Sequence, residues 1–287
     1  MKRSTGHNRG FRRVCRAFTD ALFPAKCLVC SRFFHPQIPQ AADFPPKGRY
    51  DLSVITGAKA GAFQESMSLF LCPACSHGFQ PVESPMCSTC GRMFNSREGR
   101  DHVCQQCLEQ PGRFGKARAY GIYDRALMQV IHCYKYKGDL QLAAPLGWLL
   151  FSEFVRHWSG QEIDLIVPVP LHIRRFRKRG FNQAYLLIAD WVKKAAACEV
   201  KLPDFQIAPD LLFRSKHTDP QTFLSRKRRM ENIRNAFALN RRADVKGKRL
   251  LVVDDVYTTG ATVDECIKVL CRHGAANVDV LTLAQAQ

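Results

Sequence analysis

The sequence lacks a long apolar run. None of its hydrophobic stretches reaches the roughly 18 residues that a membrane-spanning helix needs, and the strongest candidate, Leu140–Phe154, contains Pro145. The N-terminal segment is basic but has neither an apolar core nor a small-residue cleavage site, so it is not typical of a secretory signal. We therefore expect a cytoplasmic protein without a membrane span. The plainest prediction for this segment is a short amphipathic helix whose apolar face carries Phe11, Cys15, Phe18 and Leu22.

Acidic residues are also scarce. The 287 residues include 43 Lys and Arg against 25 Asp and Glu, which gives a formal net charge of +18. An excess of this sign favours polyanionic partners, namely nucleic acid, phosphorylated metabolites or anionic lipid. A solvated basic surface without a specific partner explains the charge equally well.

Cysteine, by contrast, is abundant. Eight of the 13 cysteines form four Cys-x-x-Cys pairs: Cys27/Cys30, Cys72/Cys75, Cys87/Cys90 and Cys104/Cys107. Two thiolates at this spacing can share one tetrahedral Zn²⁺ ion on a tight turn, so a metal suits them better than a disulfide framework. We expect the five single cysteines to fill the core: Cys15, Cys133, Cys198, Cys266 and Cys271.

Four pairs supply two complete Cys₄ sites. Sequential pairing joins Cys27, Cys30, Cys72 and Cys75 in one site and Cys87, Cys90, Cys104 and Cys107 in the other. It leaves 41 residues between the pairs of the first site and 13 between those of the second. A cross-braced arrangement, which joins the first pair to the third and the second to the fourth, is the alternative. Closed Cys₄ sites have no open coordination position, so we expect two structural zinc ions.

The paired cysteines all precede Leu108, and the chain changes character near Glu109–Ala117, a stretch rich in Gly, Pro and charge. We predict two domains: residues 1–110, an N-terminal helix with a double zinc-ribbon module, and residues 111–287. The first contains a Pro-rich insertion at 33–50 and one possible strand at 52–58.

Residues 111–287 alternate apolar runs with helical patterns. Strands are predicted at 116–124, 164–170, 211–214, 248–255 and 277–285, and helices at 126–138, 142–158, 182–196 and 262–274. Asn182 is the expected N-cap of the third helix. Continuous Val, Ile and Leu strands between helices indicate an α/β fold with a mainly parallel sheet covered on both faces. Ligands of such sheets bind at the carboxyl ends of the strands.

The stretch Leu250–Thr262, "LLVVDDVYTTGAT", carries the clearest chemistry. We expect its strand to end at Val253 and a helix to follow the turn. Backbone N–H groups at a helix start, with threonine hydroxyls beside them, form a phosphate site, and Gly260 lets the backbone approach the ligand. Asp254 and Asp255 suit the vicinal hydroxyls of a sugar, or Mg²⁺ near a polyphosphate. A ligand with a 5′-phosphate and free ribose hydroxyls satisfies both halves.

This stretch resembles the phosphoribosyl-pyrophosphate (PRPP) motif of type I phosphoribosyltransferases. The resemblance implies a type I phosphoribosyltransferase-like parallel sheet. It assigns the ribose hydroxyls to Asp254 and Asp255, the residues that would take part in catalysis. It assigns the 5′-phosphate to Tyr257, Thr258, Thr259, Gly260, Ala261 and Thr262.

Two further stretches, Asp164–Ala184 and His217–Phe237, accompany the motif as they do in the ComF/GntX family of competence and DNA-utilisation proteins. That family also has an N-terminal cysteine-rich zinc module, and the resemblance runs from Cys27 to the end of the chain. It implies a role in DNA uptake or in the use of DNA as a nutrient, with single-stranded DNA or DNA-processing proteins as partners.

Both stretches are strongly basic. The first carries Arg174, Arg175, Arg177, Lys178 and Arg179 and resembles the loop that meets pyrophosphate, so Arg179 is a candidate ligand residue. The second carries Arg226, Lys227, Arg228, Arg229 and Arg234 and resembles the mobile loop that closes over PRPP, which makes Arg226 a second candidate. Lys135 and Lys137 could face nucleic acid or the same pocket. The alternative for each run is a solvated basic face.

No general base is apparent. His172 and His217 are candidates by position alone, and we expect them instead to be solvent-facing loop histidines. The sequence therefore leaves three functions open: a PRPP-dependent ComF-type protein, an active phosphoribosyltransferase on a nucleobase or amine acceptor, and a PRPP-sensing zinc-ribbon scaffold. It does not indicate the acceptor, the oligomeric state or a direct DNA contact.

Overall fold

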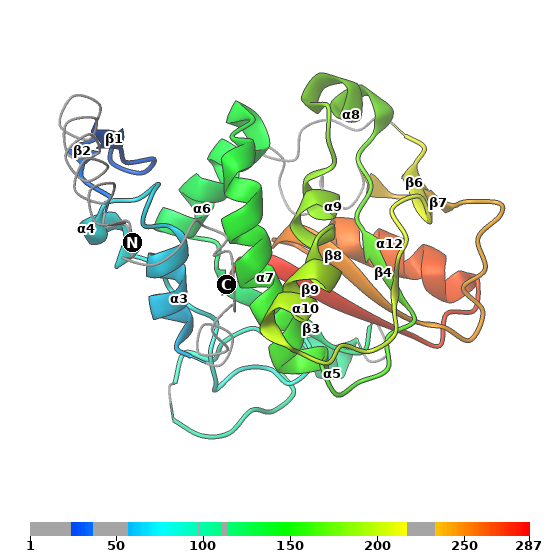
Figure 1. The fold of residues 1–287 in the computed structure, drawn as a ribbon. Helices are drawn as coiled ribbons and strands as arrows, with labels where there is room; N and C mark the ends of the chain where they lie inside the picture. The colour runs from blue at the N-terminus through cyan, green and yellow to red at the C-terminus, as the bar shows by residue number, and fades with distance from the viewer. Residues whose placement is uncertain (1–23, 37–56, 97, 111–113, 217–232) are drawn as a thin grey trace, which may run out of the picture.

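The computed structural model describes residues 24–36, 57–96, 98–110, 114–216 and 233–287 (Figure 1). Their main feature is a five-stranded sheet in the order β3-β9-β8-β4-β5, in which every neighbouring pair is parallel. The strands are β3 (Ala117–Ile122), β4 (Leu165–Pro168), β5 (Gln206–Ile207), β8 (Arg249–Tyr257) and β9 (Asn277–Gln285). The predicted parallel sheet is confirmed, and β5 is an edge strand that the sequence pattern did not reveal.

Both faces of the sheet are covered, as the apolar strands predicted. Leu251 and Val253 of β8 pack in a core with helices α7 (Ala143–Trp158), α9 (Gln183–Ile188) and α10 (Trp191–Cys198). Leu250 and Val252, which point the other way because strand side chains alternate, pack beneath α12 (Ala261–Arg272). A central strand buried on both sides needs an apolar residue at every position, which explains the continuous Leu-Leu-Val-Val run.

The helix predicted at 126–138 changes geometry before its end. It begins as α6 (Arg125–His132) and continues as a π-helical turn, η1 (Cys133–Lys137), before Gly138 ends it in the left-handed region at φ 69°. A 3₁₀ turn, η2 (Leu140–Leu142), leads into α7. Single π-helical turns of this kind often occur at functional sites because they rotate the side chains that follow.

Two other predicted elements differ from the structure. The single helix expected at 182–196 is broken into α9 and α10, because the fully buried Trp191 starts a new helix and its Nε1 donates to Leu187 O at 2.9 Å. The predicted cap is confirmed: Asn182 Oδ1 accepts from Ala184 N at 3.0 Å. The strand predicted at 211–214 forms as β6 (Leu212–Arg214), but it pairs antiparallel with β7 (Phe237–Leu239) outside the main sheet.

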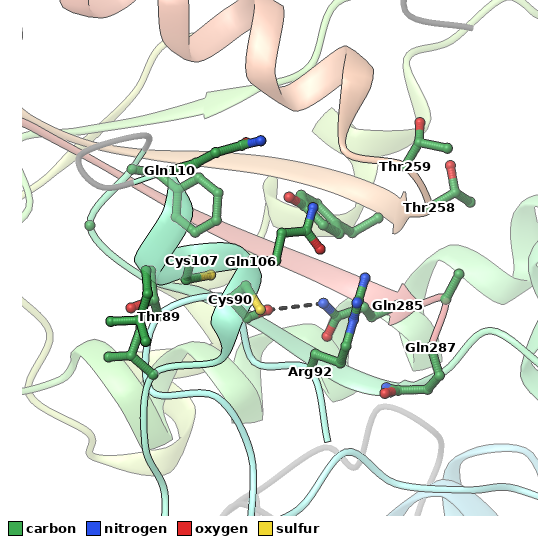
Figure 2. Close-up of a pocket in the computed structure, with 16 residues that line it drawn as sticks. Thr89, Cys90, Arg92, Gln106, Cys107, Gln110, Thr258, Thr259, Gln285 and Gln287 are labelled. Atoms are coloured by element: carbon green, nitrogen blue, oxygen red, sulfur yellow. Dashed lines mark hydrogen bonds between the residues drawn. The ribbon is translucent and has the colours of Figure 1, made fainter. Parts of the chain in front are cut away.

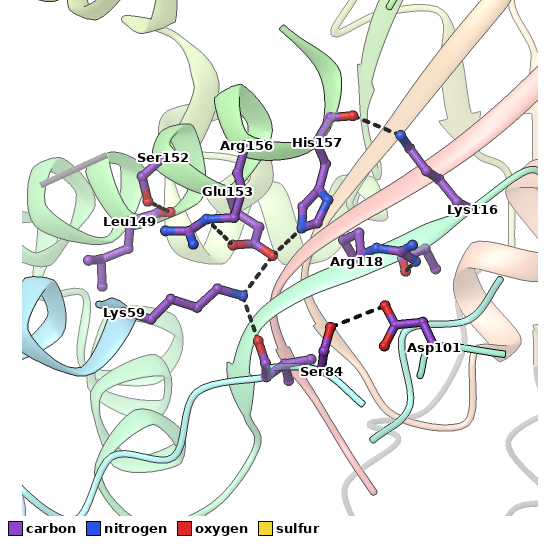
Figure 3. Close-up of polar contacts among 12 residues, drawn as sticks. Lys59, Ser84, Asp101, Lys116, Arg118, Leu149, Ser152, Glu153, Arg156 and His157 are labelled. Atoms are coloured by element: carbon purple, nitrogen blue, oxygen red, sulfur yellow. Dashed lines mark hydrogen bonds and ion pairs between the residues drawn. The ribbon is translucent and has the colours of Figure 1, made fainter. Parts of the chain in front are cut away.

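The cysteine-rich region packs against the edge of the sheet at β3. Its regular elements are β1 (Ala25–Lys26), β2 (Phe33–Phe34), α3 (Lys59–Ser66), α4 (Pro73–Ser76) and α5 (Gln105–Glu109). Val82 N donates to Tyr120 O at 3.1 Å and Ala117 N donates to Thr89 O at 2.7 Å, so this region covers an otherwise open strand edge. Figure 3 shows a buried ion pair that joins the same two regions, Lys59 of α3 and Glu153 of α7. The domain boundary near residue 110 stays a prediction.

Several predictions fall outside the described residues. These are the N-terminal helix, the Pro-rich insertion beyond Pro36, the possible strand at 52–58 apart from its last two residues, and the part of the basic stretch up to residue 232, which contains His217 and Arg226. Within the described ranges, no helix combines the length and the apolar character that crossing a bilayer requires.

Candidate functional site

A large cleft lies at the carboxyl ends of β4 and β8. Its volume is about 1080 Å³, and its walls come from the end of β8, the start of α12, the π-helical turn η1, α8 (Ile173–Arg179) and the start of α9. This is the edge at which parallel sheets bind ligands. The cleft brings together Asp254, Asp255, Tyr257, Thr258, Thr259, Gly260, Ala261, Thr262 and Arg179.

The two aspartates lie within strand β8, not beyond its end. The expectation that the strand ends at Val253 is wrong, and the range 248–255 predicted from the apolar run is also too short at this end, because pairing with β9 continues through Asp254–Thr282 to Tyr257–Gln285. Successive strand residues face opposite sides, so the two carboxylates leave the backbone in different directions although both line the cleft. Asp255 N donates to Asp254 Oδ1 at 2.9 Å, which holds the Asp254 carboxyl against its own backbone.

Lys135 is the charged partner of this pair. Its Nζ lies 2.6 Å from Asp255 Oδ1, and both side chains are largely buried. Burial alone would lower the lysine pKa, but Asp255 and Asp254 raise it above its usual value. The π-helical turn places Lys135 here. The sequence left open whether this lysine faces nucleic acid or the pocket, and in the structure it lines the pocket.

Asp254 has an unusual protonation state. Burial and the adjacent Asp255 raise its pKa to about 8, against a smaller lowering effect of Lys135. Near pH 7 its carboxyl is therefore largely protonated and can donate one hydrogen bond as well as accept. A cation or the hydroxyl groups of a sugar that entered the cleft would meet two different groups. One is the Asp255 carboxylate, which is paired with Lys135, and the other is the Asp254 carboxyl, which can release a proton.

The Thr/Gly turn leads from β8 into α12. Gly260 is the N-cap of the helix and has φ 77° and ψ −6°, a left-handed conformation that glycine adopts without strain. Thr259 Oγ1 accepts from Ala261 N at 3.4 Å. The turn thus presents threonine hydroxyls and the amide end of a 12-residue helix to the cleft, an arrangement that favours a phosphate group.

The basic stretch after β4 is a helix, not a loop. His172 caps α8, since its Nδ1 accepts from Arg174 N at 3.2 Å, and Gly180 ends the helix at φ 80°. Four cations of this helix line the cleft: Arg174, Arg175, Lys178 and Arg179. The guanidinium of Arg179 lies 5.2 Å from the centre of the Tyr136 ring. His172 is buried, so its prediction as a solvent-facing loop residue is wrong; its ring serves the helix start.

Arg214 is a cleft residue that sequence reasoning missed. It ends β6, its side chain is buried, and its guanidinium lies 5.4 Å from the Phe237 ring. Burial and the nearby Arg175 lower its pKa to about 10. The sequence contained one indication, since Arg214 directly follows the apolar run Leu211–Phe213. A charged residue at the end of a strand is well placed to face a ligand.

The eight paired cysteines gather into two clusters. Cluster 1 contains Cys27, Cys30, Cys72 and Cys75, and cluster 2 contains Cys87, Cys90, Cys104 and Cys107, with all sulfur atoms of a cluster within 4.8 Å of one another. Sequential pairing is therefore what the structure shows, and the cross-braced alternative is not. Cys30 and Cys72 lie 3.8 Å apart, as do Cys90 and Cys104. Four thiolates about 2.3 Å from one tetrahedral ion would be about 3.8 Å apart, so the clusters fit such a metal.

The backbone also favours thiolates in these clusters. Cys87 Sγ accepts from Cys90 N at 3.4 Å and from Cys104 N at 3.3 Å. Burial raises the pKa of this thiol and of Cys27, but backbone N–H donors outweigh it and lower the values to about 7 and about 6. Metal binding requires deprotonated sulfur, so each cluster contains a ligand poised for it.

The single cysteines divide into two groups. Cys133, Cys198 and Cys266 are buried, as predicted. Cys271 is exposed on α12, so its prediction as a core residue is wrong: at this point of the helix the side chain faces away from the sheet. Cys15 lies outside the described residues.

Known proteins resemble both parts of the chain. The family described as "Phosphoribosyl transferase domain" matches residues 207–287. DNA utilization protein YhgH of Escherichia coli strain K12 is 33% identical over 222 residues, which cover 75% of this chain and 90% of the relative. Competence protein F of Haemophilus influenzae is 29% identical and covers 76% of this chain and 97% of the relative.

One solved structure that the chain resembles is a hypoxanthine phosphoribosyltransferase from Staphylococcus aureus, 13% identical over 49% of this chain and 61% of its own. Its TM-score of 0.30 is too low to support an argument. The identity, the coverage and the matched domain establish the relationship without it. With its parallel α/β sheet, its phosphoribosyltransferase match and its N-terminal cysteine clusters, the chain belongs to the ComF/GntX family of competence and DNA-utilisation proteins.

Proposed function

We propose that the cleft binds PRPP or a closely related phosphoribosyl ligand, and that this binding serves a cytoplasmic role in DNA uptake or in the use of DNA as a nutrient. The observation that carries the proposal is one continuous cleft. It contains Asp254 and Asp255 in one part and the turn Thr258–Thr262, which we call the phosphate turn, in another. The role in DNA metabolism rests on the relatives named for DNA utilisation and competence.

The ligand would lie along the carboxyl edge of the sheet. The turn Thr258–Thr262 would hold the 5′-phosphate through backbone amides and hydroxyls. Asp254 and Asp255 would accept hydrogen bonds from the ribose hydroxyls, and Lys135 would hold the Asp255 carboxylate in position through their ion pair. The cations of α8, Arg179 among them, lie on another wall and would meet the pyrophosphate, because guanidinium groups bind phosphate oxygens in pairs.

Metal ions fit this arrangement in two different ways. Mg²⁺ prefers one or two carboxylates together with substrate phosphates, and Asp254 is free to lose its proton to such an ion. The cysteine clusters fit two structural Zn²⁺ ions, because four sulfur ligands leave no coordination position for a substrate. Arg226, the second basic residue predicted at the ligand, lies outside the described residues and stays a prediction.

Calorimetric titration with PRPP, with and without Mg²⁺, tests the binding site. We expect Asp254→Asn with Asp255→Asn to weaken PRPP binding at least about ten-fold, because the pair loses a charged hydrogen-bond acceptor at Asp255 and a carboxyl that can release its proton to Mg²⁺ at Asp254. Asp204→Asn is the matched control: this exposed aspartate precedes β5 and does not line the cleft. Absence of PRPP binding to the wild-type chain would overturn the proposal.

Two further measurements separate the possible roles of the site. PRPP-dependent release of pyrophosphate, assayed with nucleobase and amine acceptors, would identify an active phosphoribosyltransferase. PRPP binding without release is what we expect of a sensor. In the native host, the double aspartate variant should fail in transformation or in growth on DNA, whereas the Asp204→Asn strain should not. Equal performance of the two strains would contradict the role in DNA metabolism.

A further inference from the structure

A second cavity lies between cysteine cluster 2 and the phosphate turn (Figure 2). Its volume is about 530 Å³, and we call it the ribbon pocket. One wall comes from residues 89–92 and α5 of the cysteine-rich region, and the other from the ends of β8 and β9. It shares Tyr257, Thr258, Thr259 and Ala286 with the large cleft, but neither Asp254 nor Asp255 lines it. It therefore adjoins the proposed phosphate end of the cleft and not the ribose end.

Amide side chains dominate the polar lining of the ribbon pocket. Four glutamines contribute to it: Gln106, Gln110, Gln285 and Gln287. Two threonine hydroxyls come from the phosphate turn, and Arg92 is the one charged side chain among the described lining residues. Cys90 and Cys107 also line the pocket, but their sulfur atoms belong to cluster 2. No carboxylate of the described residues lines the pocket to hold a further cation, and one exposed arginine is little for a phosphate. Amides instead offer donors and acceptors together, which match a neutral heterocycle.

The apolar part of the lining offers flat contact surfaces. Phe114 and Tyr257 are both largely buried and contribute aromatic rings, while Val103 and Leu108 contribute aliphatic groups from the α5 region. Pockets that combine such surfaces with a few oriented polar groups are typical of small organic ligands. A nucleobase requires flat apolar surfaces against its ring faces and hydrogen-bonding groups at its polar edges, and this pocket offers both.

Gln285 adds a specific unsatisfied group. Its Nε2 donates to Cys90 O at 2.9 Å, which fixes the amide to the cluster 2 turn. Its Oε1 is buried and accepts no hydrogen bond from any described residue. A buried acceptor without a partner is unfavourable, so a ligand N–H group that reached it would gain more than an ordinary surface contact.

We propose that the ribbon pocket binds a nucleobase, held by the amides of Gln106 and Gln110 and by the rings of Phe114 and Tyr257. The base would belong to a nucleotide unit whose own phosphate takes the place of the 5′-phosphate of PRPP at Thr258 and Thr259, and this orientation rests on the proposed function. The base is not the acceptor of a ribosyl group, because the pocket does not reach the acids expected at the ribose. Two sources share this chemistry, a free nucleoside or nucleotide and a base within a DNA strand.

Binding to the full chain tests the proposal with two kinds of probe. The first is the set of four deoxynucleosides, followed by saturation-transfer NMR. The second is a fluorescein-labelled single-stranded dodecanucleotide compared with the same strand carrying abasic sites, followed by anisotropy. Abasic strands retain the phosphates and lack the bases, so the ratio of the two affinities reports base contacts alone.

The double variant Gln106→Leu with Gln110→Leu removes the amides at similar size. We expect it to weaken nucleoside binding about ten-fold, or to abolish the preference for the intact strand over the abasic one. Gln105→Leu is the matched control, because Gln105 lies on the same short helix and outside the pocket lining. Metal content and melting temperature are measured on each variant to confirm that cluster 2 is retained.

A cross-link on the wild-type chain gives a result that does not depend on any variant. A strand or nucleoside carrying 5-iododeoxyuridine should cross-link to peptides containing Phe114, Tyr257 or residues 103–110. Nucleoside binding identifies a free ligand as the source, and strand binding without nucleoside binding identifies DNA. Equal affinity for intact and abasic strands together with no nucleoside binding, or cross-links only elsewhere, would overturn the proposal. Loss of PRPP binding alone, with base binding intact, would overturn only the proposed function.

Discussion

Lys135 Nζ lies 2.6 Å from Asp255 Oδ1, and this contact joins the π-helical turn after α6 to the central strand of the sheet. It places a fixed positive charge beside two adjacent carboxyl groups. Asp255 is the ion-pair partner of this lysine, whereas burial and the neighbouring charge raise the pKa of Asp254 to about 8. The two aspartates thus have different surroundings although they are adjacent in sequence, so substitutions at the two positions should have different effects.

Removing the lysine should destabilise the protein. Lys135→Met leaves the buried Asp255 carboxylate without its partner, and we expect the free energy of unfolding to fall by about 3 kcal/mol, as for other broken buried pairs. Lys135→Met combined with Asp255→Asn should recover much of that loss, because no charge is then left unpaired. Denaturant titration of the wild type, the two single variants Lys135→Met and Asp255→Asn, and the double variant measures the coupling, and strictly additive effects would contradict the pairing.

The protonation of Asp254 should make stability depend on pH. A carboxyl whose folded-state pKa is raised to about 8 from 3.8 binds more protons folded than unfolded between those values, so its contribution becomes less favourable as pH rises towards 8. Asp254→Asn mimics the protonated form. At pH 9 it should exceed the wild type in free energy of unfolding by at least about 1.4 kcal/mol, the equivalent of one pKa unit.

The advantage of the same variant should be smaller at pH 5.5 than at pH 9, because the difference accumulates as the pH rises from 3.8 to about 8. Thermal melts between pH 5 and 9 measure the difference, with Asp204→Asn as the control for an exposed carboxylate. A difference that stays constant from pH 5 to pH 8 would show that Asp254 titrates normally.

A second buried pair ties the cysteine-rich region to the rest of the fold. Lys59 Nζ lies 2.8 Å from Glu153 Oε1 and also donates to Val82 O at 2.6 Å (Figure 3). Both side chains are at most 4% exposed. Burial raises the pKa of Glu153, but hydrogen bonds from His157 and Lys59 outweigh it, so the carboxylate stays ionised.

Lys59→Met should therefore lower the free energy of unfolding by about 3–5 kcal/mol, since it leaves Glu153 buried and charged. Arg156 provides the control. It lies 3.9 Å from the same carboxylate but is one-third exposed, and Arg156→Met should change stability by less than about 1 kcal/mol. Denaturant titration measures the free energy of unfolding of both variants. Similar losses would show that the Lys59–Glu153 pair contributes no more to stability than the partly exposed Arg156.

The sequence predicted those features that depend on local chemistry. The Val/Leu run of β8 indicated a strand buried on both faces, Asn182 indicated a helix start, and the Cys-x-x-Cys spacing indicated metal ligands. Each pattern reflects a contact within a few residues of the chain or the periodicity of one element. For that reason the parallel sheet and the helices around it could be predicted without knowing how they pack.

The features that the sequence did not predict depend on distant partners. The extension of β8 to Tyr257 requires β9, whose register cannot be deduced from the acidic turn itself. The break before Trp191 requires the apolar core beneath α7, which overrides a continuous helical pattern. Arg214 reaches the cleft only because β6 pairs with β7 outside the main sheet. Local propensity is a weak guide wherever tertiary packing decides.

The two cysteine clusters should affect the ligand sites differently when their metal is lost. Cluster 2 is hydrogen-bonded to the sheet edge, since Thr89 O accepts from Ala117 N at 2.7 Å and Cys90 O accepts from Gln285 Nε2 at 2.9 Å. Cluster 1 instead packs beside α3, with Cys27 in the core of that region. Metal binding would supply folding free energy to such turns. Loss of the metal from one cluster should therefore loosen only the segments that pack against that cluster.

We predict that Cys104→Ser with Cys107→Ser increases hydrogen exchange of the Ala117 amide and of residues 285–287 about ten-fold or more, because local opening becomes easier. Cys72→Ser with Cys75→Ser should leave both regions protected and expose residues 59–71 instead. Metal analysis should give two zinc ions for the wild-type chain and one for each variant. Since β9 pairs with β8 at Tyr257–Gln285, the first variant should also weaken PRPP binding, whereas the second should not. If both variants opened the same amides, or if neither changed the exchange at Ala117, cluster 2 would not be what holds the phosphate turn in place.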